Sequence, residues 1–255
     1  MMKTDVFKNE KIEMLNRFVQ NTDVHIFLTG KAGTGKTTFL RNLAVKSYKR
    51  MVIVAPTGVA AINAGGVTIH SFFQLPFGPI APEGQQAAVN GQQPLSFLSN
   101  VKINKTKLKI MRSLDLLVID EISMVRADLL DAVDAVLRKV RRSSDAFGGV
   151  QVLMIGDIQQ LAPVARQNEW ELLQPYYKSV YFFDSHVLKN NPYICVELNQ
   201  IYRQNDEDFI KILNQVRNNK LDKQSRNWTY ECSCEFPYNI NLCYYYNIIY
   251  VLYKL

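Results

Sequence analysis

The glycine-rich segment Gly30–Thr37 constrains this chain more than any other feature. It reads Gly-x-x-x-x-Gly-Lys-Thr, the pattern of a phosphate-binding loop. The apolar run 25–29 precedes it, and residues 37–46 carry apolar side chains at helical spacing. A strand, a glycine loop and a helix start are the context that this motif needs, so a chance glycine turn is the weaker alternative. The segment therefore predicts a nucleotide-binding site.

The roles predicted for this loop follow from the chemistry of a polyphosphate. Glycines let the backbone turn tightly and direct its N–H groups inward, and the positive end of the next helix adds to the attraction. The residues predicted to bind the nucleotide are Gly30, Ala32, Gly33, Thr34, Gly35, Lys36, Thr37 and Thr38. Lys36 is expected to reach the β- and γ-phosphates, and the Thr37 hydroxyl to bind Mg²⁺. The expected cofactors are ATP and Mg²⁺.

A polar pair, Asp120-Glu121, follows the apolar run 114–119, which is typical of a strand covered on both faces. Asp120 would hold Mg²⁺ opposite Thr37, directly or through water. Glu121 could take a proton from the water that attacks the γ-phosphate. Gln160, after the next apolar run, could orient water or sense the γ-phosphate, with an ordinary turn as the alternative. These residues favour hydrolysis over nucleotide binding alone.

The order of apolar segments predicts an α/β fold with a doubly wound, mostly parallel sheet and helices on both faces. Strands are expected at residues 25–29, 51–54, 114–119, 150–155 and 180–183, with 180–183 as the last strand of the sheet. Helices are expected at residues 10–20, 37–46, 126–142 and 206–218. Ligands of such sheets bind at the carboxyl ends of the strands, where the polar motifs fall.

Two segments depart from this alternation. Residues 74–104 are rich in Pro, Gly and Gln and are too long for an idle connection, so we expect a small functional insertion. Residues 226–255 hold seven of the 13 tyrosines, three of the four cysteines and only four charges. We predict one domain over residues 1–220 and an atypical tail, 221–255. The tail is interpreted as out-of-frame sequence or a disordered remnant, with a tyrosine platform as the alternative.

Composition sets wider bounds. Hydrophobic residues make up 47% and charged residues 21%, as in ordinary globular proteins, and the net charge of +7 weakly favours a polyanionic partner. Residues 1–11 carry charges of both signs, unlike a signal peptide, and no apolar run reaches the length of a membrane span. The four cysteines do not form a disulfide framework. We expect a soluble, monomeric, cytoplasmic protein, nucleoid-associated in a bacterium, with no membrane partner.

Five motifs in order resemble those of superfamily 1B DNA helicases, in the petite-integration-frequency (Pif-type, RecD-like) family. They are GKAGTGKTT, APTGVAAINAGGVTIHSFF, VIDEISM, GDIQQLAPV and LNQIYRQ, within residues 22–218. The resemblance implies a RecA-like motor domain that couples ATP hydrolysis to single-stranded DNA in a 5′→3′ helicase. It also implies roles in DNA repair, recombination and telomere maintenance, and a wedge subdomain at residues 74–104.

The resemblance further implies that Thr57, Gly58 and His70 touch the backbone of single-stranded DNA. From the residues alone, Thr57 could instead be a helix N-cap, and a histidine in a turn is more often packed than a ligand. Phe72 and Phe73 could stack on bases, with core packing as the alternative for at least one of them.

The resemblance assigns Gln160 and Arg203 to the γ-phosphate, whereas an arginine in general is more often a surface ion-pair residue. No adenine-reading glutamine precedes the glycine loop, and nothing after Lys220 resembles a second RecA-like domain. We therefore expect this chain to be a truncated motor half. The alternatives are a non-catalytic, nucleotide-dependent module that grips single-stranded DNA or a partner subunit, and an ATPase unrelated to DNA.

Overall fold

The computed structural model describes residues 10–31, 33–82, 98, 102–200 and 215. The chain divides into two compact units, residues 1–201 and 202–255. Apart from Gln215, all described residues belong to the first unit. The predicted boundary at residue 220, the helix at 206–218 and the tail thus lie almost wholly outside the described residues and stay predictions.

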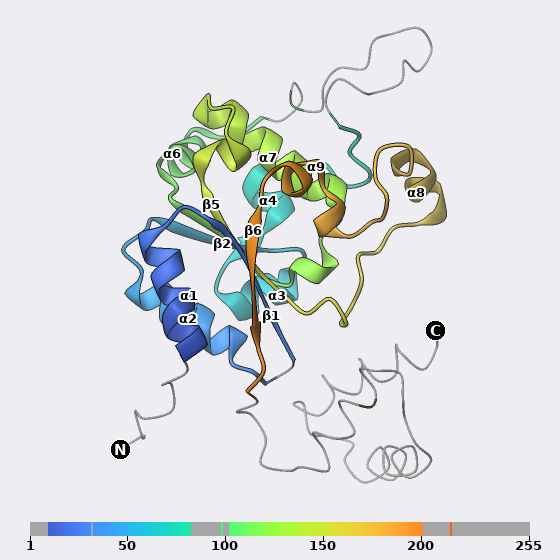
Figure 1. Cartoon of the computed structure of the whole chain (residues 1–255). Coiled ribbons are helices and arrows are strands. Elements are labelled where there is room, and N and C mark those ends of the chain that lie inside the picture. The colour runs from blue at the N-terminus through green and yellow to red at the C-terminus, as the bar shows by residue number, and fades with distance from the viewer. Residues whose placement is uncertain (1–9, 32, 83–97, 99–101, 201–214, 216–255) are drawn as a thin grey trace, which may run out of the picture. The chain divides into compact units, whose positions relative to one another are not determined.

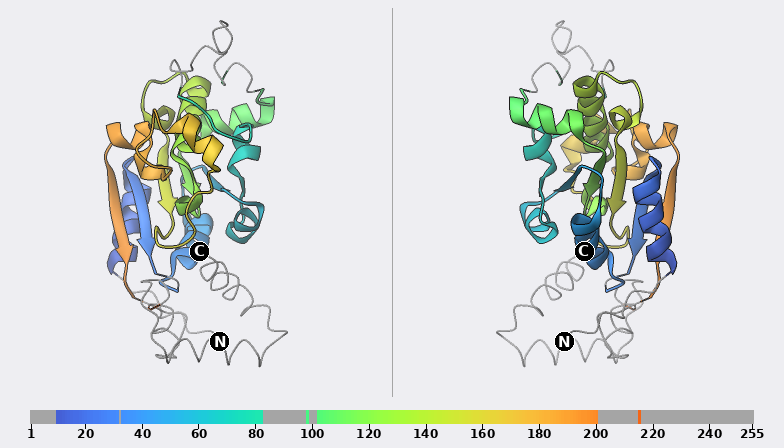
Figure 2. Two further views of the ribbon diagram at one scale, coloured as in Figure 1. Left: turned by 90° about the vertical axis from the view of Figure 1, so that its right-hand side faces the viewer. Right: turned by 90° about the vertical axis from the view of Figure 1, so that its left-hand side faces the viewer.

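The first unit is built on a parallel sheet of six strands. The strands are β1 (His25–Gly30), β2 (Met51–Ala55), β3 (Val67–Thr68), β4 (Leu116–Ile119), β5 (Gln151–Ile155) and β6 (Tyr193–Leu198). They lie in the order β3-β2-β4-β5-β1-β6, and every neighbouring pair is parallel. Figure 2 shows β6, in orange, at one edge beside the blue β1. The doubly wound α/β fold is therefore confirmed, with a sheet that is parallel throughout.

Helices alternate with these strands along the chain. They are α1 (Glu10–Asn21), α2 (Lys36–Lys46), α3 (Gly58–Ala64), α4 (Ile69–Phe73), α6 (Lys105–Ser113), α7 (Ala127–Arg141), α8 (Gln167–Leu173) and α9 (His186–Asn190). Short 3₁₀ turns lie at η1 (Ile122–Met124), η2 (Ala146–Gly149) and η3 (Phe182–Asp184). None of the helices in the described ranges is long and apolar enough to cross a membrane.

The sheet divides the core into two apolar layers, one on each face. The first layer contains residues of α4, α6, α7 and α9, and the second contains residues of α1 and α2. Figure 1 shows α1 and α2 on one side of the sheet and α7 and α9 on the other. Strand β4 explains the division: Leu117 and Ile119 point into the first layer, whereas Leu116 and Val118 point into the second. Successive side chains of a strand face opposite ways, so a central strand must be apolar throughout.

The predicted strand at residues 180–183 is wrong. Tyr181 makes one isolated antiparallel bridge to Arg126, and the chain then turns into η3. Phe182 is fully buried and packs edge-on against Phe27, so its apolar character serves the core without any strand. The sixth strand is β6, which pairs with β1 from His25↔Tyr193 to Gly30↔Leu198.

Candidate functional site

Three strand ends bring the polar motifs to one edge of the sheet. Strands β4, β5 and β1 are consecutive neighbours and parallel, so their carboxyl ends share a rim. Pairing continues to that rim: Gly156 N donates to Leu28 O at 3.1 Å, and Asp120 N donates to Val54 O at 2.9 Å. The glycine loop, the Asp120-Glu121 pair and the turn after β5 therefore leave the sheet side by side.

The glycine loop follows the carboxyl end of β1 and leads directly into α2. Gly33 and Gly35 have φ values of 79° and 95°, in the left-handed region that glycine adopts without strain. Helix α2 starts at Lys36 directly after Gly35, which has no side chain to cap it. The first N–H groups of a helix lack partners within the helix, so this end suits an anion.

One hydroxyl contact and two ammonium contacts hold the loop in shape. The Thr34 side chain is buried, and its hydroxyl donates to Lys31 O at 2.8 Å. Lys36 Nζ donates to Gly30 O at 2.5 Å and to Lys31 O at 3.0 Å, so the ammonium lies inside the curve of the loop. Gly30 has no room for a side chain, because an added Cβ would lie 2.6 Å from Leu198 O. Ala32 lies outside the described residues.

Asp120 and Glu121 share the rim with Lys36. Burial raises the pKa of Asp120, and the Glu121 N–H and the Lys36 ammonium oppose that rise. Burial and the neighbouring Asp120 charge raise the pKa of Glu121, with Lys36 again opposing and Asp157 adding to the rise. Lys36 thus acts electrostatically on both carboxyl groups. The three residues therefore lie within electrostatic range of one another at the rim.

Glu121 also carries backbone strain. Its φ of 52° places a non-glycine residue in the left-handed region, where it precedes η1. Such conformations cost about 1–3 kcal/mol and cluster at functional sites. The left-handed conformation turns the chain directly after Asp120, where β4 has ended.

The donor set at the rim fits magnesium. Thr37 and Asp120 offer a hydroxyl and a carboxylate oxygen, the hard ligands that Mg²⁺ prefers. In the described part of the chain, no group of three or more His, Cys, Asp or Glu side chains could form a metal site by itself. Mg²⁺ bound with phosphates takes only one or two protein ligands and completes its shell with phosphate oxygens and water, so two donors suffice.

The turn after β5 holds Gln160 by way of Asp157. Asp157 is buried and accepts from Gln159 N at 3.2 Å and from Gln160 Nε2 at 3.3 Å. Gln160 N also donates to Asp157 O at 2.9 Å. The turn conformation is therefore present, and a role at the γ-phosphate stays a prediction. Asp157 was assigned no role from the sequence, although a carboxylate directly after a buried strand is the signal that marked Asp120.

The residues expected to touch DNA divide between helix capping and the core. Thr57 is the N-cap of α3, and its hydroxyl oxygen accepts from Ala60 N at 3.2 Å. Gly58 begins the helix and is exposed. Capping of α3, the alternative for the Thr57 side chain, is thus present. A backbone contact to DNA at this helix start stays a prediction.

Phe72 takes the core alternative. It is 5% exposed and packs edge-on against Phe73 at 4.9 Å between ring centroids, so its ring has no free face for a base in this structure. His70 instead stacks on Phe77, with ring centroids 4.8 Å apart and planes 20° apart, and Phe77 is 89% exposed. The exposed aromatic residue near His70 is therefore Phe77, which the sequence analysis missed. Arg203 lies outside the described residues.

Comparisons with known proteins agree with this architecture. The sequence model of one family, described as PIF1-like helicase, matches residues 6–227. The ATP-dependent DNA helicase PIF1 of Saccharomyces cerevisiae is 30% identical over 230 residues, which are 88% of this chain and 24% of the relative. The Homo sapiens protein of the same name is 39% identical over 193 residues, which are 75% of this chain and 27% of the relative.

A solved structure extends the likeness to the fold. The crystal structure of Pif1 helicase from Bacteroides in complex with ADP-AlF3 and ssDNA matches with a TM-score of 0.77 and 42% identity, over 87% of this chain and 48% of that one. The predicted RecA-like fold is confirmed by this match. The chain spans about a quarter of the length of the curated relatives it matches. Because the sequence model of this family matches most of the chain, the chain belongs to the PIF1-like helicase family.

Proposed function

We propose that this chain supplies the ATP-hydrolysing half of a 5′→3′ DNA helicase. The observation that carries the proposal is the convergence of Lys36, Asp120 and Glu121 at one rim, above a glycine loop that opens a helix. Lys36 holds the loop through Gly30 O and Lys31 O and also acts electrostatically on two half-buried carboxyl groups, which supports a role at a phosphate beyond its structural one.

Each residue has a chemical task in this proposal. Lys36 contacts the β- and γ-phosphates, while Thr37 and Asp120 hold Mg²⁺, which when bound neutralises phosphate charge. Glu121 accepts the proton of the attacking water, and its raised pKa brings its basicity nearer to the working pH. Gln160, tethered by Asp157, and Arg203 act at the γ-phosphate.

Single-stranded DNA is the proposed partner at the same rim. A Bacteroides relative has been crystallised with ssDNA. The exposed start of α3, at Thr57 and Gly58, offers backbone N–H groups to a phosphate. The stacked pair of His70 and Phe77 offers an exposed ring to a base, as aromatic residues do in single-strand binding.

We further propose that unwinding needs a second motor domain beyond these residues, in a cytoplasmic protein that acts as a monomer. Two such domains close on ATP and open after hydrolysis, whereas the described rim provides one wall of the site. The curated relatives are about four times longer than the matched segment, which supports this division.

The test measures ATP turnover by the purified 255-residue chain with Mg²⁺, with and without an oligonucleotide of deoxythymidine. We expect slow turnover that the single strand stimulates, no unwinding of a tailed duplex, and no turnover in Lys36→Ala. Lys46→Ala, at the exposed far end of α2, is the matched control and should behave as the wild type.

Other results would point elsewhere. Turnover that ignores the oligonucleotide would favour an ATPase unrelated to DNA. Oligonucleotide binding that depends on ATP, without any turnover, would favour the non-catalytic module. Robust strand separation by this chain would show that a second motor domain is unnecessary.

A further inference from the structure

Positive charge is concentrated in two segments, each of which precedes a central strand of the sheet. Residues 102–114 contain five lysines and arginines and no acid, and residues 138–144 contain four and no acid. These segments hold nine of the chain's 30 basic residues, which leaves 21 bases against 23 acids in the rest. The net charge of +7 therefore resides in these two segments.

The fold brings the two segments together on one surface. Helix α6 packs on α7, and Arg141 joins their ends by donating to Met111 O at 3.1 Å and Arg112 O at 2.8 Å. Both helices end where strands β4 and β5 begin, so this surface lies at the amino edge of the sheet, opposite the nucleotide rim. We call it the basic α6–α7 surface, defined by Lys105, Lys109, Arg112, Lys139 and Arg142.

The charges of this surface are not used up by ion pairs. All five residues are exposed, and in the described ranges none of them makes a salt bridge. The neighbouring Arg138 differs, because it pairs with Asp134 at 2.7 Å. Within the surface set, Arg112 Nε donates to Val140 O at 3.4 Å and Lys139 Nζ donates to Leu98 O at 2.7 Å, but a carbonyl does not neutralise a cation. The five cations are therefore exposed and have no carboxylate partner among the described residues.

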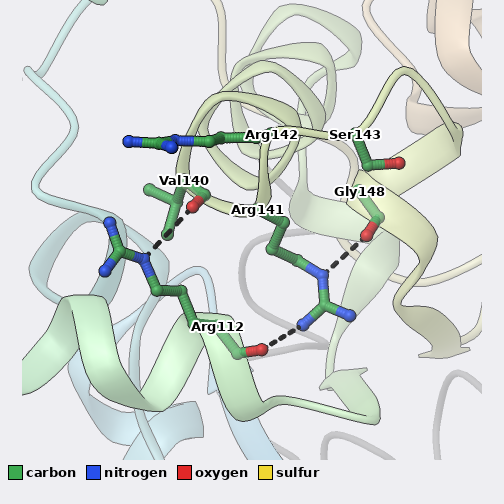
Figure 3. Close-up of a pocket in the computed structure, with 6 residues that line it drawn as sticks. All are labelled: Arg112, Val140, Arg141, Arg142, Ser143 and Gly148. Carbon is green, nitrogen blue, oxygen red and sulfur yellow. Dashed lines mark hydrogen bonds between the residues drawn. The ribbon is translucent and has the colours of Figure 1, made fainter.

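A hollow of about 450 Å³ lies between the helix ends. Its lining includes Arg112, Arg141, Arg142 and Ser143. Figure 3 shows the guanidinium groups of Arg112 and Arg142 on the same side of the hollow, while Arg141 turns the other way, toward Gly148 O and Arg112 O. Two guanidinium groups that line one hollow without a carboxylate partner in the described residues would be stabilised by a bound anion.

The spacing fits a polynucleotide backbone. Lys105, Lys109 and Arg112 are exposed at i, i+4 and i+7 on α6, so they form one stripe about 10 Å long. One strand of duplex DNA presents a phosphate about every 3.4 Å along the axis, so the stripe spans roughly three phosphates. Single-strand sites combine such charges with stacking aromatic side chains, and none of the exposed residues of α6 or of residues 138–144 is aromatic.

We propose that the basic α6–α7 surface binds the phosphodiester backbone of duplex DNA, at a position separate from the single-strand contacts of the rim. This inference rests on the proposed function for its choice of DNA. It adds a second nucleic-acid contact, one that would hold the duplex arm of a junction while the rim holds the strand.

The experiment compares two triple variants of the full chain. The surface variant is Lys109→Gln, Arg112→Gln and Arg142→Gln, which keeps a non-glycine residue at the positive φ of Arg142. The control variant is Arg17→Gln, Arg41→Gln and Lys46→Gln, which removes the same charges from exposed positions on α1 and α2, on the other face of the sheet. Thermal unfolding of both checks that the fold is kept.

Fluorescence anisotropy then measures binding of a labelled blunt duplex and a labelled oligonucleotide of deoxythymidine over a range of salt concentrations. We expect the surface variant to lose duplex affinity at least tenfold and to reduce the slope of log K against log salt by about 2 to 3, since each lost phosphate contact removes about 0.9. Single-strand binding and ATP turnover should stay as in the control variant.

Each other outcome decides a separate point. Equal duplex binding by both variants would overturn the inference and leave the proposed function intact. An equal loss of single-strand and duplex binding in the surface variant would also overturn it, because the surface would then belong to the strand track. Loss of binding to vesicles containing phosphatidylserine, with duplex binding kept, would assign the surface to a membrane instead. Duplex binding that needs the surface, in a chain without strand-stimulated turnover, would keep the inference and refute the proposed function.

Discussion

Two clusters of charged side chains in this domain differ in how many partners their carboxyl groups have. At the nucleotide rim, burial raises the pKa of both Asp120 and Glu121, and the Lys36 ammonium only partly compensates. At the start of α7, the Asp128 carboxylate is 1% exposed and is held by two hydrogen bonds from Arg126, each 2.9 Å long.

The second cluster is closed by its own chain. Asp128 also accepts from Ile80 N at 2.9 Å, and Arg126 donates to Gly78 O at 2.6 Å and to Glu169 at 3.2 Å. We call these groups the α7 clamp: they tie the residues after α4 and the start of α8 to one helix end. Removing one partner of a fully bonded buried charge leaves the other uncompensated and destabilises the fold. The half-buried carboxyl groups of the rim are instead available to a ligand. The difference predicts which substitutions change catalysis and which change stability.

The largest expected effect is at the rim. Glu121→Gln should lower ATP turnover by about 10²–10⁴-fold, because a positioned general base contributes that much. It should also stabilise the protein without nucleotide at neutral pH. The pKa of Glu121 in the folded state is raised above its ordinary value of 4.5. As pH rises above 4.5, the unfolded chain therefore loses this proton more readily than the folded protein, which lowers the free energy of unfolding. Glutamine does not ionise, so the variant lacks this loss.

The pH dependence separates this account from a generic mutational effect. The stability gain of Glu121→Gln should be absent below pH 4.5, where the glutamate is protonated in both states, and should grow as pH rises. Chemical denaturation at several pH values measures it, with the exposed Glu13→Gln in α1 as the control. A variant that turns over ATP normally, or that is destabilised at neutral pH, would contradict the proposed difference between the clusters.

The α7 clamp should respond in the opposite sense. Asp128→Ala leaves the Arg126 guanidinium, with its side chain 14% exposed, without its main partner, so we expect a loss of about 3–5 kcal/mol in the free energy of unfolding. Asp23→Ala, which removes an ion pair whose carboxylate is 93% exposed, should cost under about 1 kcal/mol. Urea denaturation compares them. Equal small losses would mean that the clamp contributes little.

The rim could be predicted from the sequence because its signals are local. A glycine pattern after an apolar run, and a carboxylate pair after another, fix what must lie at neighbouring strand ends once the sheet is parallel. The edge strand β6 gave no such signal, since only Val196 and Leu198 of its residues are buried. The aromatic pair Phe182-Phe183 led to the wrong prediction of a strand, because a short apolar run does not distinguish a strand from a buried turn.

Tertiary packing decided the remaining features. The core role of Phe72 had a signal in the sequence, because it lies three residues after Ile69 on α4 and both are buried. The α7 clamp had none, since Ile80 and Asp128 meet only through tertiary packing. The two basic segments are visible in the sequence, but their meeting on one surface depends on the packing of α6 on α7.

Substitution of Phe77 should have a smaller effect than the changes at the rim and the α7 clamp, and it should change DNA binding without changing stability. Phe77→Ala should weaken the binding of single-stranded DNA by about 1–3 kcal/mol, the usual worth of one base stacked on an aromatic ring. Stability should hardly change, because the ring is 89% exposed. Phe72→Ala is the contrast and should cost about 3–5 kcal/mol of stability, as a buried ring does. Anisotropy titration and denaturation measure the two effects. Unchanged DNA affinity in Phe77→Ala, with Phe77→Tyr as the ring-preserving control, would remove the stacking role.

The smallest expected effect separates the two roles considered for Thr57. Thr57→Ala removes the cap oxygen that accepts from Ala60 N, so the free energy of unfolding should fall by about 1 kcal/mol. Thr57→Ser keeps that oxygen and should restore stability. If Thr57 serves the DNA only through the backbone at the start of α3, the serine variant should also bind single-stranded DNA as the wild type does. Weaker DNA binding by a serine variant of full stability would instead show that the threonine methyl group contacts the strand, which would give this rim residue a function separate from its place in the fold.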